Sequence, residues 1–264
     1  MARILAITNQ KGGVGKTTTG VNLAASLAAV KQRVLLVDLD PQGNATMGSG
    51  IDKRSLKATV YHVLLGEATL AQVRVRATNG DKAGEYDVVP ANRELAGAEV
   101  EMVDMEHRET RLKDAIAAHA SEYDFVLIDC PPALNLLTVN GLTAAHAVMI
   151  PMQCEYYALE GLSDLVQTVK KVRAHLNPGL EIEGLLRTMF DPRNTLAQQV
   201  SQQLLDHFGD KVYRTVIPRN IRLAEAPSHG LPVMHFDRTS KGAQAYIALA
   251  GEMLNRNNPV AAAL

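Results

Sequence analysis

The chain has 264 residues, 47% of them hydrophobic, with a formal net charge of −1 and two cysteines. This size and composition allow a sizeable core, while the near-neutral charge gives no overall electrostatic preference for nucleic acid. Two cysteines provide neither a disulfide framework nor a metal site. No apolar run reaches the roughly 18 residues of a membrane span, and the N-terminus leads directly into a predicted strand rather than a signal peptide. We therefore expect a cytoplasmic protein.

The predicted elements alternate between strand and helix along the chain. The predicted strands 33–38 and 123–129 contain unbroken apolar runs at residues 34–37 and 125–128, which indicates strands buried on both faces and hence a parallel sheet. The predicted strands are 2–8, 33–38, an edge strand after residue 71, 86–89, 123–129, 146–152, 181–190 and 212–218. The predicted helices are 16–31, 58–66, 94–120, 135–145, 159–176, 194–208 and 239–255, with loops at 38–44 and 219–237 and a frayed tail at 255–264.

This alternation is typical of a doubly wound α/β fold, a mostly parallel sheet with helices on both faces. The chain contains no repeat, low-complexity segment or recognisable linker. We therefore expect a single domain spanning residues 1–264.

A glycine-rich loop between the first strand and the first helix is the most informative stretch. Residues 11–18 read K-G-G-V-G-K-T-T, and the three glycines let the backbone curl so that its N–H groups face an anion. The N-terminus of the following helix adds further free N–H groups. Lys16 can reach the β- and γ-phosphates of a nucleotide, and the Thr17 hydroxyl can bind Mg²⁺. The stretch therefore predicts a site for a nucleoside triphosphate and Mg²⁺.

The loop departs from the general phosphate-loop pattern at its start. That pattern has glycine five positions before Gly15, where this chain has Gln10, and a second lysine, Lys11, follows it. If Lys16 serves the nucleotide of its own chain, Lys11 has little to do for that nucleotide, and the general pattern gives it no role.

Three aspartates follow predicted strands, at the sheet edge where ligands of such folds bind. Asp129 ends the strand 123–129, Asp38 ends the strand 33–38, and Asp40 follows two residues later. Mg²⁺ prefers oxygen ligands and keeps several waters, so Asp129 is placed to hold it, and Asp38 is a further candidate. Asp40 can orient an attacking water, since positioning is most of the task in phosphoryl transfer. The alternative for each is a turn or capping role, as before Pro41.

Four segments together resemble the ParA/Soj family of chromosome-partitioning ATPases, in family order and over nearly the whole chain. The loop alone marks only the wider class of deviant-Walker ATPases, which includes MinD, Mrp-type carriers and the nitrogenase iron protein. The proline-containing fourth segment narrows the likeness to the partition branch. The segments are residues 11–18, 38–44 (D-L-D-P-Q-G-N), 127–132 (L-I-D-C-P-P) and 217–228 (I-P-R-N-I-R-L-A-E-A-P-S).

The resemblance implies roles for individual residues. Lys11 resembles the signature lysine that reaches across a dimer to the partner's nucleotide. Asp40 resembles the aspartate that engages the hydrolytic water, and Asp129 the carboxylate that holds Mg²⁺ through water. The catalytic residues are thus expected to be Lys11, Lys16 and Asp40. The nucleotide is expected to contact Lys11, Gly12, Gly13, Val14, Gly15, Lys16, Thr17, Thr18, Pro218 and Asn220, with Gly12 packed at the dimer interface, Thr17 on Mg²⁺, and Pro218 and Asn220 against adenine.

The resemblance also implies contacts to non-specific double-stranded DNA. Arg193 and Arg222 match family arginines with this role, and Lys241 is a further candidate. Residues 165–246 carry 11 Lys/Arg against 7 Asp/Glu, a balance of +4, while the remainder balances at −5. The alternative is an ordinary solvated surface. With few aromatic residues to stack on bases, any DNA contact should be to phosphates and insensitive to sequence.

We therefore predict an ATPase that uses ATP and Mg²⁺ and acts as a DNA-partitioning switch. By the resemblance, ATP drives sandwich homodimerisation and DNA binding, and hydrolysis, stimulated by a ParB-type centromere-binding partner, resets the protein. The expected location is cytoplasmic and nucleoid-associated, with a chromosome or a plasmid as cargo.

Three alternatives share the fold or the loop. A membrane-positioning ATPase of the MinD kind needs a basic amphipathic C-terminal helix, whereas residues 251–264 hold one arginine and a proline. An Mrp-type carrier needs paired cysteines that are missing here, and a small-molecule kinase needs an acceptor site that the sequence does not reveal. From the C-terminal sequence we expect no membrane partner. The eight histidines have no metal-ligand spacing, so we also expect no histidine metal centre.

Overall fold

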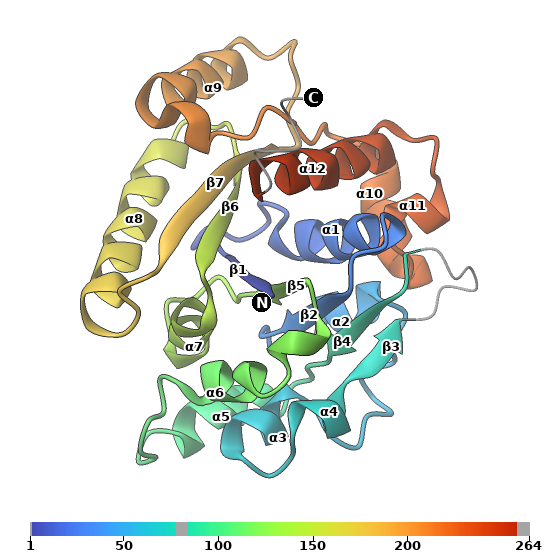
Figure 1. The fold of residues 1–264 in the computed structure, drawn as a ribbon. Helices are drawn as coiled ribbons and strands as arrows, with labels where there is room; N and C mark the ends of the chain where they lie inside the picture. The colour runs from blue at the N-terminus through green and yellow to red at the C-terminus, as the bar shows by residue number, and fades with distance from the viewer. Residues whose placement is uncertain (1, 78–83, 258–264) are drawn as a thin grey trace.

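A computed structural model describes residues 2–77 and 84–257 and contains one seven-stranded sheet (Figure 1). The strand order is β3-β4-β2-β5-β1-β6-β7, and each neighbouring pair is parallel except β3 and β4, which are antiparallel. The strands are β1 (Arg3–Ile7), β2 (Val34–Asp38), β3 (Val75–Ala77), β4 (Tyr86–Val89), β5 (Phe125–Asp129), β6 (Ala147–Gln153) and β7 (Glu181–Thr188). The predicted α/β fold with a mostly parallel sheet is confirmed.

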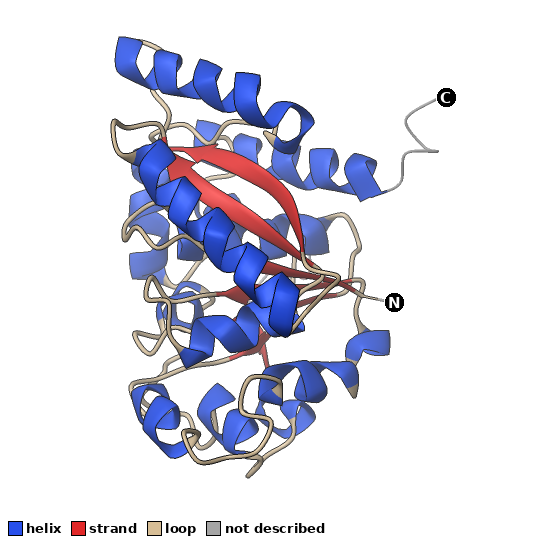
Figure 2. Ribbon diagram, turned by 90° about the vertical axis from the view of Figure 1, so that its left-hand side faces the viewer, coloured by secondary structure: helices blue, strands red, loops and turns tan. Residues whose placement is uncertain are grey.

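Helices cover both faces of this sheet, as the turned view shows (Figure 2). The longer helices are α1 (Lys16–Ala29), α7 (Leu136–Ala144), α8 (Ala158–His175), α9 (Thr195–Phe208) and α12 (Lys241–Asn257). The shorter ones are α2 (Asn44–Gly48), α3 (Val60–Leu65), α4 (Leu70–Val73), α5 (Leu95–Glu101), α6 (Arg111–Ala117), α10 (Ile221–Glu225) and α11 (Val233–Phe236), with 3₁₀ turns η1 (Ala120–Glu122), η2 (Gly209–Lys211) and η3 (Ala226–His229).

Two hydrophobic cores form because successive strand residues point to opposite faces. On β1, Leu5 and Ile7 belong to the core beneath α1 and α12, whereas Ile4 and Ala6 belong to the core beneath α7 and α8. Every residue of β2 and β5 is buried, as expected of strands covered on both sides. The central strands are therefore fixed in place, and their carboxyl ends provide a rigid base for the loops that follow them.

The prediction of one long helix over residues 94–120 is wrong. The segment forms two short helices, α5 and α6, joined by turns. His107 adopts a positive φ of 56°, which an α-helix does not allow. The guanidinium of Arg108 donates to the carbonyl of Val103. In a continuous helix this carbonyl would instead accept from a backbone amide one turn later. The charge pattern of the sequence is compatible with a helix throughout and gives no sign of this break.

Two predictions for the C-terminal part also need correction. Residues 212–218 do not form a strand; they contribute only isolated parallel bridges, Leu185 to Val212 and Phe190 to Pro218. Proline lacks the N–H that a continuing ladder requires. The predicted loop 219–237 contains α10 and α11. Of the predicted frayed tail, residues 258–264 lie outside the described residues, and so do residues 78–83, where the sequence predicted a turn.

Candidate nucleotide site

The loop between β1 and α1 adopts a conformation that needs its glycines. Gly13 and Gly15 have φ values of 73° and 89°, in the left-handed region where a side chain is strained. Helix α1 begins at Lys16, which is 8% exposed, and its ammonium donates to the carbonyl of Lys11 over 3.0 Å. Burial lowers the pKa of Lys16, while Asp129 and Asp40 act in the opposite direction. A lysine held in this way is well placed to receive a phosphate in a partly dry environment.

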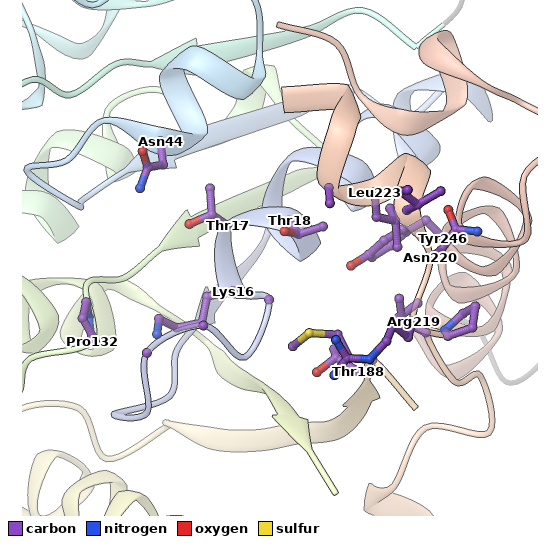
Figure 3. A pocket seen from close by; sticks show the side chains of 18 of the residues that line it. Lys16, Thr17, Thr18, Asn44, Pro132, Thr188, Arg219, Asn220, Leu223 and Tyr246 are labelled. Atoms are coloured by element: carbon purple, nitrogen blue, oxygen red, sulfur yellow. The ribbon is translucent and has the colours of Figure 1, made fainter. Parts of the chain in front are cut away.

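A cavity of about 580 Å³ opens beside this loop. In the close view, Lys16, Thr17 and Thr18 lie at its centre, Asn44 and Pro132 on one side, and Thr188, Arg219, Asn220, Leu223 and Tyr246 on the other (Figure 3). The cavity therefore has a cationic, N–H-rich end and a more apolar end, as a nucleotide requires. The cavity is lined by nine of the site residues that the sequence predicted, namely Gly12, Gly13, Gly15, Lys16, Thr17, Thr18, Asp40, Pro218 and Asn220.

Two buried aspartates lie side by side at the ends of β2 and β5. Asp38 pairs in register with Asp129 across these strands, and both are 0% exposed. Asp38 accepts hydrogen bonds from the amide and hydroxyl of Thr46, over 2.8 and 2.7 Å, and from the amide of Asp40 over 3.1 Å. Burial nevertheless raises the pKa of Asp38 to about 6. Asp38 thus fixes the start of the loop that carries Asp40.

Asp129 is in a different situation. Among the described residues, neither of its carboxylate oxygens has a hydrogen-bond partner of normal geometry. Burial, and after it the charge of Asp38, raises the pKa of Asp129 well above its usual range; Thr17 opposes this rise from nearby, although no hydrogen bond of normal geometry joins the two residues. A buried carboxylate without a partner is costly, and a hydrated Mg²⁺ would satisfy it.

Thr17 and Asp129 thus fit a magnesium ion that keeps most of its ligands as water and phosphate oxygens. Within residues 2–77 and 84–257, no group of three or more histidine, cysteine, aspartate and glutamate side chains is arranged to hold a metal.

Asp40 lines the cavity on a loop of defined shape. Its carboxylate accepts from the amide of Gln42 over 2.9 Å, and Lys53 donates to the carbonyl of Gln42. Gly43 has a φ of 61°, and a Cβ there would lie 2.6 Å from the carbonyl oxygen of Ala91. The loop is therefore held against the end of β4, with Asp40 facing the cavity.

The more apolar end of the cavity is built by the segment that follows β7. The Asn220 side-chain oxygen accepts from the amide of Arg222 over 3.1 Å and so caps α10, which leaves its NH₂ group for a ligand. Tyr246 of α12 joins Thr19 of α1 through their hydroxyls at 3.2 Å. Ten further residues line the cavity that were not predicted as site residues: Asn44, Pro132, Thr188, Met189, Ile217, Arg219, Ile221, Leu223, Ala224 and Tyr246. Seven of them stand in the motifs that carried the resemblance, whereas nothing local distinguishes Thr188, Met189 or Tyr246 from core residues.

Two predicted loop residues do not line the cavity. The side chain of Lys11 points instead to Glu155, with Nζ 2.5 Å from Oε2. Val14 is 1% exposed, so only its backbone is available, and its carbonyl accepts from the Thr188 hydroxyl over 2.8 Å. The structure thus places Lys16 in the cavity and Lys11 outside it.

The predicted DNA contacts lie outside the cavity. Arg193, in the loop before α9, pairs with Asp191 over 2.8 Å, and its side chain is 88% exposed. Arg222 on α10 pairs with Glu225 over 2.8 Å and with Asp237 over 3.3 Å. Lys241 is exposed at the start of α12 and makes no ion pair within the described part of the chain.

The fold and this site define a P-loop ATPase, and comparison with known proteins agrees. A family model described as an AAA domain matches residues 2–182. The chain is 55% identical over 253 residues to the sporulation initiation inhibitor protein Soj of Bacillus subtilis, covering 96% of this chain and 98% of that protein. It is 51% identical over 256 residues to the chromosome partitioning protein ParA of Caulobacter vibrioides NA1000, covering 96% and 94%. The chain belongs to the ParA/Soj family of chromosome-partitioning ATPases.

A solved structure matches the fold over nearly the whole chain. The structure named cobyrinic acid a,c-diamide synthase from Mycobacterium smegmatis, with bound ADP and magnesium, superposes with a TM-score of 0.83 at 40% identity, covering 97% of this chain and 95% of that one. Together with the family and the donor set of the cavity, this confirms the predicted ATPase with ATP and Mg²⁺ as cofactors. No helix in the described residues is long and apolar enough to cross a membrane.

Proposed function

We propose that this partitioning ATPase is an ATP-driven dimer switch that binds DNA without sequence preference. The observation that carries the proposal is the outward position of Lys11 beside an open loop. A Cβ at Gly12 or Gly13 would meet nothing within 4 Å, so this surface is free to receive a second copy. Lys16 serves the nucleotide of its own chain, and Lys11 serves that of the partner.

Within each copy, the residues divide the work of hydrolysis. Lys16 and the backbone N–H groups of the loop bind and orient the triphosphate. Asp40, facing the cavity, holds the attacking water in line with the terminal phosphate. Thr17, and Asp129 through water, would hold Mg²⁺, which neutralises the developing charge when bound. Lys16 and Asp129 are buried, and electrostatic contacts are stronger where water is excluded.

Dimerisation would also double the number of cationic contacts to DNA. Affinity for DNA rises steeply with the number of phosphates neutralised, so two copies bind far better than one. Arg193, Arg222 and Lys241 are the proposed contacts, and Asp191, Glu225 and Asp237 compete with DNA for the two arginines. A ParB-type DNA-bound partner would accelerate hydrolysis and return monomers that leave the DNA.

The deciding experiment measures molar mass by light scattering after size exclusion, with ATP, ADP or no nucleotide, each with and without DNA of two unrelated sequences. The proposal expects a dimer with ATP alone and a DNA complex only under that condition, equally with both sequences. The proposal would be overturned if the protein stays monomeric with ATP and if the Asp40→Ala variant, in which hydrolysis should be slow, also stays monomeric with ATP. Co-sedimentation with liposomes, and not with DNA, would favour the membrane-positioning alternative instead.

A further inference from the structure

Met189, the residue directly after β7, has an unusual backbone. Its φ of 48° lies in the left-handed region, which residues with side chains rarely adopt and which persists only where the surroundings impose it. Lys31 and His107 are the other two non-glycine residues with positive φ in the described chain, and neither lines the nucleotide cavity, whereas Met189 does. Strained residues gather at ligand sites, so the position calls for a ligand-based explanation.

The residues on both sides of Met189 are held by different parts of the site. Thr188, 2% exposed, donates its hydroxyl to the carbonyl of Val14 in the phosphate loop over 2.8 Å. The amide of Phe190 donates to the carbonyl of Ile217 over 3.0 Å, next to the bridge between Phe190 and Pro218. Met189 is therefore fixed between the phosphate end and the apolar end of the cavity, and the turn it makes directs its half-buried side chain inward.

We propose that Met189 is a nucleotide-binding residue whose thioether packs on the base of the bound nucleotide. The inference rests on ATP occupying this cavity. A thioether offers a phosphate little, but it makes favourable contacts with aromatic rings, and its unbranched chain adapts to a flat surface. Ile217, Pro218 and Leu223 supply further apolar lining at this end, and the free NH₂ of Asn220 can donate to a ring nitrogen at the edge of the base.

The test separates the base from the triphosphate. Binding of Mg²⁺–ATP and of Mg²⁺–tripolyphosphate, which has no base, is measured by calorimetry for the wild type and for Met189→Ala, Met189→Gly and Met189→Leu. Met189→Gly removes the side chain at a φ that glycine adopts freely, so its fold should be intact, and its thermal melting checks this. Met47→Ala, at an exposed methionine of α2 that does not line the cavity, is the matched control.

We expect the alanine and glycine variants to bind ATP roughly five-fold more weakly, and tripolyphosphate as the wild type does. The leucine variant should keep most of the ATP affinity. Unchanged ATP affinity in both truncated variants would overturn the inference, and so would an equal loss for tripolyphosphate, because the residue would then act through the loop. A wild-type protein that binds tripolyphosphate but not ATP would overturn the nucleotide assignment itself.

Discussion

Lys11 is bound to a carboxylate of its own chain, with its ammonium 2.5 Å from Oε2 of Glu155 at the end of β6. Both side chains are nearly half exposed, and exposed ion pairs of this kind contribute only about 0.2–1 kcal/mol. A contact this weak can be exchanged for a partner's phosphate at little cost. The lysine is thus held in the free chain by an interaction that a second nucleotide can replace.

Lys11→Ala should therefore keep its ATP affinity and lose the ATP-dependent dimer. Glu155→Gln should release the lysine and strengthen the dimer by roughly two- to five-fold, the equivalent of one surface ion pair. Analytical ultracentrifugation across a concentration series measures both effects, with Glu160→Gln on α8 as the control for lost charge. A stable ATP dimer of Lys11→Ala would contradict the role of this lysine.

Lys16→Ala should remove most of the affinity for ATP. The variant removes the buried cation of the loop, and charge-assisted contacts to phosphate are among the strongest in proteins, so a loss on the order of 100-fold is expected. Calorimetry with a non-hydrolysable analogue measures the affinity, and Lys170→Ala on the exposed face of α8 is the control. Retained affinity in the variant would show that the phosphates lie elsewhere.

Asp40→Ala should bind ATP normally and hydrolyse it slowly. Because positioning or deprotonating a nucleophile contributes roughly 10²–10⁴-fold, the rate of phosphate release should fall by about that factor. The exposed Asp104 between α5 and α6 provides the matched control variant, Asp104→Ala. A variant that hydrolyses ATP at the wild-type rate rules out this role for Asp40.

Arg222→Glu should lose DNA binding while it keeps ATP-dependent dimerisation. The substitution reverses a charge beside Glu225 and Asp237, and each lost phosphate contact should reduce the slope of log affinity against log salt by about one. Filter binding over a salt series measures this, with Arg33→Glu, whose partner is Asp124, as the control. If Arg222→Glu no longer dimerises, the arginine has a structural role instead.

The stability of the metal-free protein should depend on the ionisation of Asp38. Its pKa is raised from 3.8 to about 6, so the folded state binds this proton more tightly than the unfolded chain does. The associated stability is present below the ordinary pKa of 3.8 and is lost as the pH rises through the raised pKa of about 6.

Urea unfolding in EDTA, without nucleotide, measures this dependence. Asp38→Asn cannot ionise, so its unfolding free energy should rise relative to wild type between pH 4 and pH 7. Asp52→Asn, at an exposed aspartate, should follow the wild-type curve. Parallel curves for Asp38→Asn and wild type would contradict the shifted pKa.

The sequence alone was sufficient to predict most of the sheet and the phosphate end of the site, although it also predicted a strand at 212–218 that does not form. Strands such as β2 and β5 are continuous apolar runs, and the loop before α1 has glycines where the backbone needs positive φ. These signals are local, since burial on both faces and left-handed turns each impose a residue type on the positions concerned. Asp40 and Asn220 were predictable because their motifs resemble a family in order and spacing.

Tertiary structure alone decided which distant residues complete the site and how its charges are paired. Met189 and Tyr246 enter the cavity from β7 and α12, which nothing in their neighbouring residues indicates. The pairing of Lys11 with Glu155, the contact of Arg222 with Asp237, and the absence of a partner for Asp129 among the described residues depend on where separate segments meet. A local pattern specifies backbone conformation and burial, whereas contacts between segments far apart in sequence form only when the whole sheet is assembled.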